Sequence, residues 1–278
     1  MPTLSQVNVL MLIVEFCLNK FMKIKVVIPC HLDSVRLEQK VLIDIHGLPM
    51  IEHVRRRALL SNKIESVFIA TGDLEIKNII EKFGGDVLYT KENHSNGTSR
   101  VSEAISSLDC THIVLIQGDE PLLIPDYLDI FIDKMVKSKN EIMWNGISTI
   151  DDKESYEDTS IVKCKLNNND NIISCFRKTT IDHINNNTKN NIYKIQGLIG
   201  YERNFLEEMV KQPDTKISKS ESIEQMKAIE IGKKIKGILI PKSLPSVNTK
   251  EELGIVNKIL ETDTYQIKIL NKIKNEFL

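Results

Sequence analysis

Short apolar runs alternate with amphipathic segments through the first half of the chain. Runs rich in β-branched residues predict buried strands at 25–29, 66–71, 86–89 and 111–116, with a shorter strand at 41–45. Apolar positions spaced three to four residues apart predict helices between them, at about 50–61, 74–83, 99–108 and 126–138. This alternation indicates βαβ units and a mostly parallel sheet, in which ligands bind at the carboxyl ends of the strands.

The rhythm changes after about residue 140. Three strands are predicted without helices between them, at 160–165, 172–176 and 192–197, and Asn-rich loops separate them. We interpret residues of about 142–200 as an antiparallel insertion, the sort of element that often forms a dimer surface or a lid. Further along, the pattern predicts helices at 204–211, 222–232 and 250–260, a strand at 235–240, and a helical tail over 263–278.

The N-terminal segment stands apart from this pattern. Residues 7–18 are apolar except for Asn8 and Glu15, but a bilayer span takes about 20 apolar residues. The segment also lacks the basic start and small-residue cleavage site of a secretory signal. We interpret 1–22 as an extension and Met22 as the natural start, with a packing helix or a weak interfacial anchor as alternatives. The sequence thus predicts a main domain over 23–262 and no stable membrane span.

Charge and cysteine content narrow the class of protein. Lys and Arg number 37 against 38 Asp and Glu, a formal net charge of −1. Surfaces that follow nucleic-acid phosphates are usually basic, so this balance argues against nucleic acid as the main partner. The five cysteines contain no CxxC pair, and they indicate neither a zinc site nor a disulfide framework. Small buried thiols in a reducing cytoplasm are the expected state.

Charged residues follow two of the predicted strands. Arg36 and Lys40 come after 25–29, and Gln117 and Asp119 come after 111–116. The two cations suit a phosphate or carboxylate, and Asp119 could hold Mg²⁺ with phosphate oxygens. Arg100 begins a helix after a glycine, which favours an anion site. Neither a GxGxxG fingerprint nor a P-loop is present, and solvated surface charges or an ordinary capped helix would also explain these residues.

Several short motifs occur in a recognisable order. Residues 29–40 read PCHLDSVRLEQK and residues 47–51 read GLPMI. HSNGTSR at 94–100, QGDEP at 117–121, IEQMK at 223–227 and VNTKEEL at 247–253 follow. In this order the chain resembles the CMP-Kdo synthetase family (3-deoxy-manno-octulosonate cytidylyltransferases), whose motifs read PARxxSxRLPxK, GxPMI, HxSGTxR, QGDEP, LEQLR and VDTxEDL. The resemblance runs from about residue 23 to 262.

The resemblance implies a Rossmann-like nucleotidyltransferase sandwich with an antiparallel dimerisation insertion, in a cytoplasmic homodimer. It implies transfer of CMP from CTP to Kdo or a related ulosonic acid, with release of pyrophosphate and Mg²⁺ as cofactor, for lipopolysaccharide or surface-polysaccharide synthesis. Catalytic roles fall to Arg36, Lys40 and Asp119. The implied binding residues are His31, Ser34, Lys40, Thr71, Arg100 and Gln117 for the nucleotide, Arg36, Gln117, Tyr201, Glu224 and Gln225 for the sugar, and Asp119 and Asn248 for the metal.

Some positions depart from the family pattern. His31 replaces an arginine and Asn248 an aspartate, which reduces the charge available to the triphosphate and to the metal. Ile195 and Ile199 replace a histidine and a tyrosine. Because an unpaired buried hydroxyl costs about 1–3 kcal/mol, these isoleucines predict a modified or different ulosonic acid, or slow turnover. The alternatives are a nucleotidyltransferase for another sugar or alditol phosphate and a catalytically degenerate nucleotide-binding homologue.

Overall fold

The computed structural model describes residues 22–34, 36–91, 93–150, 153–179 and 191–277. The expected N-terminal extension, 1–22, lies outside these ranges except for Met22. Across the described ranges, every helix is too short or too polar to cross a membrane.

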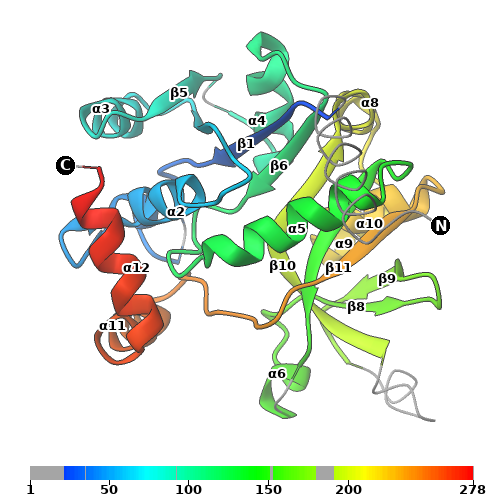
Figure 1. Cartoon of the computed structure of the whole chain (residues 1–278). Coiled ribbons are helices and arrows are strands. Elements are labelled where there is room, and N and C mark those ends of the chain that lie inside the picture. The colour runs from blue at the N-terminus through cyan, green and yellow to red at the C-terminus, as the bar shows by residue number, and fades with distance from the viewer. Residues whose placement is uncertain (1–21, 35, 92, 151–152, 180–190, 278) are drawn as a thin grey trace, which may run out of the picture.

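In the described part of the chain, nine strands form one mixed sheet through the centre of the molecule (Figure 1). On one side, parallel strands lie in the order β5 (Asp86–Tyr89), β4 (Val67–Thr71), β1 (Ile24–Pro29) and β6 (His112–Ile116). The long strand β10 (Ile192–Glu202) pairs antiparallel with β6. Beyond it lie β7 (Met143–Ser148), β11 (Ile235–Leu239), β9 (Asn171–Phe176) and β8 (Lys163–Leu166).

Strand β10 connects the parallel half of the sheet to a closed ring of strands. Its first residues pair with β8 on one side and with β7 on the other. Because β8 pairs with β9, β9 with β11 and β11 with β7, the ring closes on itself. The β10–β7 register shifts between Ile195 and Ile199, which marks a bulge. Such bulges bend a strand, and this one lies next to the cavity described below.

Helices cover both faces of the sheet (Figure 1). One face packs against α2 (Met50–Leu59), α3 (Leu74–Lys82), α5 (Pro125–Lys137), α11 (Lys250–Thr262) and α12 (Thr264–Asn275). The other packs against α4 (Gly97–Ala104), α8 (Arg203–Lys211) and α10 (Glu224–Glu230), and α9 (Lys216–Glu221) lies beside α10. A short helix, α6 (Lys153–Glu157), precedes β8.

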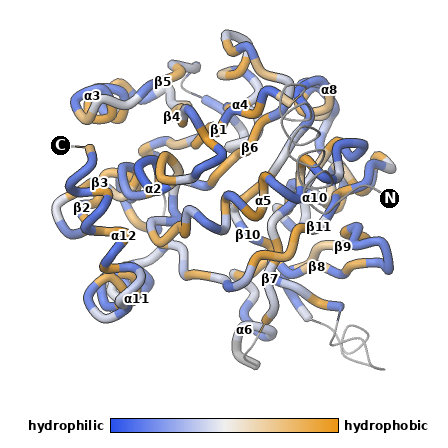
Figure 2. Tube along the Cα trace, viewed as in Figure 1, coloured by the Kyte–Doolittle hydropathy of each residue, from blue (hydrophilic) through white to orange (hydrophobic). Residues whose placement is uncertain are grey.

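The alternation of side chains along each strand explains the two layers of helices. On β1, Val26 and Ile28 belong to the hydrophobic core on one face, while Val27 belongs to the core on the other. Strands buried on both faces must be apolar throughout, and β1, β4 and β6 are coloured mainly as hydrophobic in Figure 2. The continuous apolar runs of the sequence therefore follow from this sandwiched position.

The structure confirms the predicted strands β1, β4, β5 and β6 and most predicted helices to within a few residues. The predicted strand at 41–45 is wrong. Residues Lys40–Leu42 form a 3-10 turn, and only β2 (Asp44–Ile45) pairs with β3 (Leu48–Pro49). His46 and Gly47 have φ values of 51° and 88°, so they form a tight hairpin that leaves two residues to pair on each side.

Other differences concern the second half of the chain. Strand β7 and helix α9 were not predicted, and β10 continues to Glu202 rather than ending at residue 197. The helix expected to begin at 222 begins at Glu224, because Ser222 has a left-handed φ of 52° and ends α9 instead.

We expect the free energy of unfolding to fall in acid partly because of His53. This side chain is fully buried on α2, with Nε2 2.7 Å from the carbonyl of Ile45, and burial lowers its pKa from 6.5 to about 4. Between these values the unfolded chain binds a proton that the folded chain does not, so stability falls as pH drops. His53→Gln should show a smaller loss of Tm between about pH 7 and pH 5.

The exposed Asn169, which carries no titratable group, provides a control. Asn169→Gln should keep the full acid dependence of the wild-type Tm. An equal acid dependence in His53→Gln and wild type would contradict the assignment to His53.

Candidate active site

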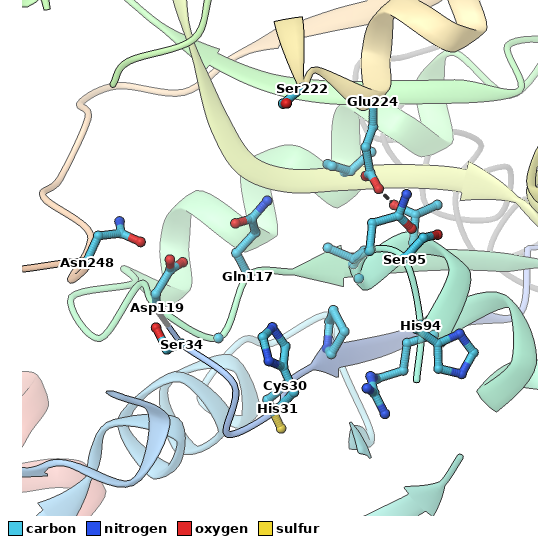
Figure 3. A pocket seen from close by; sticks show the side chains of 18 of the residues that line it. Cys30, His31, Ser34, His94, Ser95, Gln117, Asp119, Ser222, Glu224 and Asn248 are labelled. Atoms are coloured by element: carbon cyan, nitrogen blue, oxygen red, sulfur yellow. Dashed lines mark hydrogen bonds between the residues drawn. The ribbon is translucent and has the colours of Figure 1, made fainter. Parts of the chain in front are cut away.

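A cavity of about 700 Å³ opens at the carboxyl ends of β1 and β6. The loops that follow these strands, the N-terminus of α4 and the start of α10 surround it (Figure 3). In Figure 3, Glu224 lies at one side, Asp119 and Asn248 lie at another, and Gln117 lies between them. The predicted site residues that line the cavity are His31, Ser34, Arg36, Lys40, Arg100, Gln117, Asp119, Glu224, Gln225 and Asn248.

Lys40 joins three segments that are far apart in the sequence. Its ammonium lies 2.7 Å from Asp119 Oδ2 and 2.9 Å from Asn248 Oδ1. The Arg36 guanidinium donates to the same Asn248 oxygen at 3.1 Å. The Lys40 and Asp119 side chains are only 18% and 14% exposed, so this ion pair is largely shielded from water. We call Arg36, Lys40, Asp119 and Asn248 the charged cluster.

The backbone holds the charged cluster together as well. The amide of Val247 donates to the carbonyl of Asp119 at 2.9 Å, which fixes the loop before α11 beside the end of β6. Asn248 is also held in place, because its backbone N–H donates to Glu252 Oε2, in the first turn of α11, at 2.6 Å. The positions of Asp119 and Asn248 thus depend on two chain segments that meet only in the folded protein.

The charged cluster has the donor set of a partial magnesium site. Across the described residues, no three or more His, Cys, Asp and Glu side chains gather closely enough to hold a metal. Asp119 offers a carboxylate and Asn248 an amide oxygen, both directed at Lys40 Nζ. Mg²⁺ commonly takes one or two protein oxygens plus phosphate oxygens and water. These residues therefore fit a magnesium ion that arrives with a polyphosphate.

Helix α4 contributes a fixed arginine. Asn96 caps the helix through its Oδ1, which accepts from the amide of Ser99 at 2.8 Å. Arg100 lies one turn further along, is only 3% exposed and lines the cavity. Its Nη1 donates to the Thr90 hydroxyl at 2.7 Å, so the residues after β5 hold the guanidinium in place. An anion in the cavity would meet a cation that needs no rearrangement.

Glu224, the first residue of α10, reaches across to α4. Its Oε2 accepts from the Thr98 hydroxyl at 2.5 Å, the dashed line in Figure 3. Its Oε1 is shielded and has no hydrogen-bond partner among the described residues. Burial raises the pKa of this carboxyl, while the Thr98 hydrogen bond and the charge of Lys227 act in the opposite direction. A ligand that donates to Oε1 would satisfy the remaining oxygen.

Asn145 on β7 holds a residue of the site in place, and sequence reasoning missed it. It is fully buried, and its Nδ2 donates to the carbonyls of Gln196 and Leu198 across the β10 bulge. Its Oδ1 accepts from Gln225 Nε2 at 2.8 Å. Asn145 therefore positions Gln225 relative to the bulge. An asparagine in the middle of the buried run 143–148 is the signal that could have identified it.

Arg177 was also missed, although it lines the cavity. Its guanidinium donates to the carbonyls of Ser160 at 2.9 Å and Glu221 at 3.0 Å. A further donation reaches the carbonyl of Ser222, which lies two residues before the start of α10, at 3.4 Å. Arg177 therefore ties the segment before β8 to the turn that presents Glu224.

Two predicted site residues do not line the cavity. Thr71 is fully buried, and its hydroxyl accepts from the amide of Asp73 at 3.1 Å. Tyr201 is fully buried within the core that packs against α8 and α10. Cys30 does line the cavity, but burial raises its pKa to about 12, so the thiol stays protonated at neutral pH.

This site, on this fold, belongs to a nucleotidyltransferase. The profile of the family described as "Cytidylyltransferase" matches residues 25–235, and the chain belongs to this family. The membership agrees with the motif resemblance read from the sequence.

Individual relatives show which cytidylyltransferases the chain is similar to. The chain is 33% identical over 246 residues to 8-amino-3,8-dideoxy-manno-octulosonate cytidylyltransferase of Shewanella pealeana, covering 87% of this chain and 100% of the relative. It is 35% identical over 244 residues to 3-deoxy-manno-octulosonate cytidylyltransferase of Fusobacterium nucleatum, covering 87% and 99%. Among solved structures, CMP:2-keto-3-deoxy-manno-octonic acid synthetase complexed with CTP is similar, with a TM-score of 0.81 and 27% identity over 87% of this chain and 99% of that one.

Gly197 should tolerate no side chain. Its amide donates to Glu120 Oε1 at 2.9 Å, and a Cβ here would lie 2.3 Å from that oxygen and 3.0 Å from Gln117 Cγ. We expect Gly197→Ala to lower the free energy of unfolding by about 1–3 kcal/mol and to displace Gln117 from the cavity. Denaturant titration and nucleotide-binding calorimetry would measure both effects.

Gly254 on α11 is the matched control. A Cβ there meets nothing within 4 Å, so Gly254→Ala should raise stability by about 0.5–1 kcal/mol through helix propensity. Equal stability changes in the two variants would refute the close approach at Gly197.

Proposed function

We propose that the protein transfers CMP from CTP to Kdo or a related ulosonic acid and releases pyrophosphate. This reaction would serve lipopolysaccharide or surface-polysaccharide synthesis in the cytoplasm. The observation that carries the proposal is the position of the charged cluster across the cavity from Glu224. The charged cluster suits a triphosphate, and the unpaired Oε1 of Glu224 on the other side can accept a hydrogen bond from a sugar acid.

The chemistry follows from charge and position. The anomeric hydroxyl of the sugar attacks the α-phosphorus in line, and pyrophosphate leaves from the opposite side. Lys40 and Arg36 neutralise the negative charge that the phosphates bring into a shielded site. Arg100 contributes a third cation, already held by Thr90. Catalysis would therefore depend mainly on positioning and on electrostatic stabilisation.

Binding roles divide along the cavity. We assign the nucleotide to His31, Ser34, Lys40, Arg100 and Gln117, with Thr71 supporting the end of β4 from within the core. We assign the sugar to Arg36, Gln117, Glu224 and Gln225, with Tyr201 acting from the buried layer behind them.

We assign the cofactor Mg²⁺ to Asp119 and Asn248. When bound, the ion would neutralise phosphate charge and orient the phosphate oxygens. Asn248 supplies an oxygen without a charge, so Asp119 alone brings a carboxylate to the pair. The affinity for the metal would then depend largely on the phosphates of the nucleotide.

At the level of architecture, we propose a Rossmann-like sandwich that dimerises through the antiparallel insertion of about residues 142–200. The closed ring that contains β8 and β9 supports this role, since Ile173 on β9 is 51% exposed. An exposed large apolar residue on a strand suits burial against a second copy of the chain.

Pyrophosphate release should require CTP together with an ulosonic acid. Purified protein would be assayed with CTP or UTP, Mg²⁺, and a panel of ulosonic acids and sugar phosphates. Lys40→Met should lower kcat by about 100-fold or more because it removes a cation from the reacting phosphates. Lys268→Met, an exposed change on α12, should leave kcat unchanged. Absence of pyrophosphate with every ulosonic acid would overturn the proposal.

Asn248→Asp should strengthen metal binding. The added carboxylate beside Asp119 favours a divalent cation, so the Mg²⁺ concentration at half-maximal activity should fall about 10-fold. Calorimetric titration of Mn²⁺ into the CTP complex provides a readout independent of turnover. Asn169→Asp, which adds the same charge in an exposed turn between β8 and β9, should change neither quantity. Unaltered Mn²⁺ affinity in Asn248→Asp would exclude this position from the metal site.

A further inference from the structure

One wall of the cavity is apolar. The side chains that form it are Leu115, Val162, Ile195, Ile199 and Ile223, and we call them the apolar wall. Leu115, Ile199 and Ile223 are at most 3% exposed and belong to the core between the sheet and α4, α8 and α10. Val162 and Ile195 pack against the same core. The wall is therefore the face of a packed core that opens into the cavity.

Backbone pairing fixes the apolar wall in place. Leu115 on β6 and Ile199 on β10 are direct register partners in the sheet. The amide of Ile195 donates to the carbonyl of Val162 at 2.9 Å. None of these five side chains can donate or accept a hydrogen bond. A hydroxyl pressed against the wall would lose its water and gain no side-chain partner there.

The polar groups next to the wall are largely engaged within the protein. Glu224 and Gln225 follow Ile223 directly along the chain. The Gln225 amide donates to Asn145, and the Thr98 hydroxyl donates to Glu224. The shielded Glu224 Oε1 is left to receive a hydrogen bond from a ligand. This side of the cavity thus offers few contacts to a tail that carries several hydroxyls.

The position of the wall indicates which part of a sugar acid meets it. The reacting anomeric carbon has to lie near the phosphates, hence near the charged cluster. Gln117 lies between the charged cluster and Glu224 (Figure 3). The exocyclic tail, which points away from the anomeric carbon, would then extend toward Glu224 and the apolar wall.

We propose that the apolar wall selects an ulosonic acid whose exocyclic tail ends in a methyl-bearing group, such as a deoxygenated carbon or an N-acetyl group. The inference rests on the proposed function and narrows its substrate class. Burying a methyl group against the wall is favourable, whereas burying an unpaired hydroxyl there is costly. The wall therefore discriminates between substrates because it offers no hydrogen-bond partner to a hydroxyl.

The test compares substrates that differ only at the end of the tail. With saturating CTP, kcat/KM would be measured for Kdo, 8-deoxy-Kdo, 8-acetamido-8-deoxy-Kdo and 8-amino-8-deoxy-Kdo. We expect a methyl-bearing substrate to exceed Kdo by about 10- to 100-fold, the range by which hydrophobic pockets reject an added hydroxyl. Equal or better use of Kdo, or preference for the 8-amino compound, would overturn the inference.

A substitution in the wall should shift this preference. Ile195→Thr places a hydroxyl in the wall and should reduce the preference for methyl-bearing substrates about 10-fold. Ile195→Val is the matched control, because valine has nearly the size of threonine but is fully apolar, and this variant should retain the preference. Calorimetry with CTP would verify that both variants still bind nucleotide. An unchanged preference in Ile195→Thr would contradict the role of the wall.

A binding measurement separates this inference from the proposed function. Saturation-transfer NMR of the CTP complex with 8-deoxy-Kdo should show the strongest saturation at the terminal methyl group. Absence of turnover with every compound, together with that methyl contact, would overturn the proposed reaction but support the role of the apolar wall. Turnover without preference for methyl-bearing tails, or saturation centred on the ring protons, would support the reaction but overturn the role of the wall.

Discussion

The interaction on which the site depends is the bridge from the Lys40 ammonium to Asp119 and Asn248. It joins the loop after β1, the end of β6 and the approach to α11. Charges shielded to this extent are stable only when they are paired and hydrogen-bonded, so the three segments must come together correctly for the site to form. The Val247–Asp119 backbone hydrogen bond sets the same arrangement from the main chain. Folding and charge neutralisation are thus coupled at one point.

Strand β10 performs the second structural task. It pairs antiparallel with the last strand of the parallel half, closes the ring of strands, and carries two residues of the apolar wall. Asn145 donates hydrogen bonds to the bulge of β10 and accepts one from Gln225. The shape of the strand and the position of Gln225 in the cavity therefore depend on the same side chain. The close approach of Gly197 to Glu120 fixes the bulge against the loop after β6.

The sequence pattern predicted the strands of the parallel half of the sheet. Helices cover both faces of β1, β4 and β6, and strands buried in this way need a continuous apolar run. Strand β5 lies beside β4 at the edge of the sheet, and its nearly continuous apolar run was enough to predict it. The strand at 41–45 was wrong because a hairpin with two left-handed residues decided the conformation of its neighbours. Strand β7 was missed because Asn145 and Gly146 interrupt its apolar run, and their reason for being there is contact with β10 and α10.

The sequence by itself determined the parallel half of the fold, the family, and the presence of cations and a carboxylate after particular strands, because these depend on local periodicity and on motif order. Only the tertiary structure decided which of these groups share a cavity. It placed Arg36, Lys40, Asp119 and Asn248 within hydrogen-bond reach and left Thr71 and Tyr201 in the core. It also brought side chains from four separate segments into one apolar wall. Contacts across such sequence distances are set by packing, which no local pattern encodes.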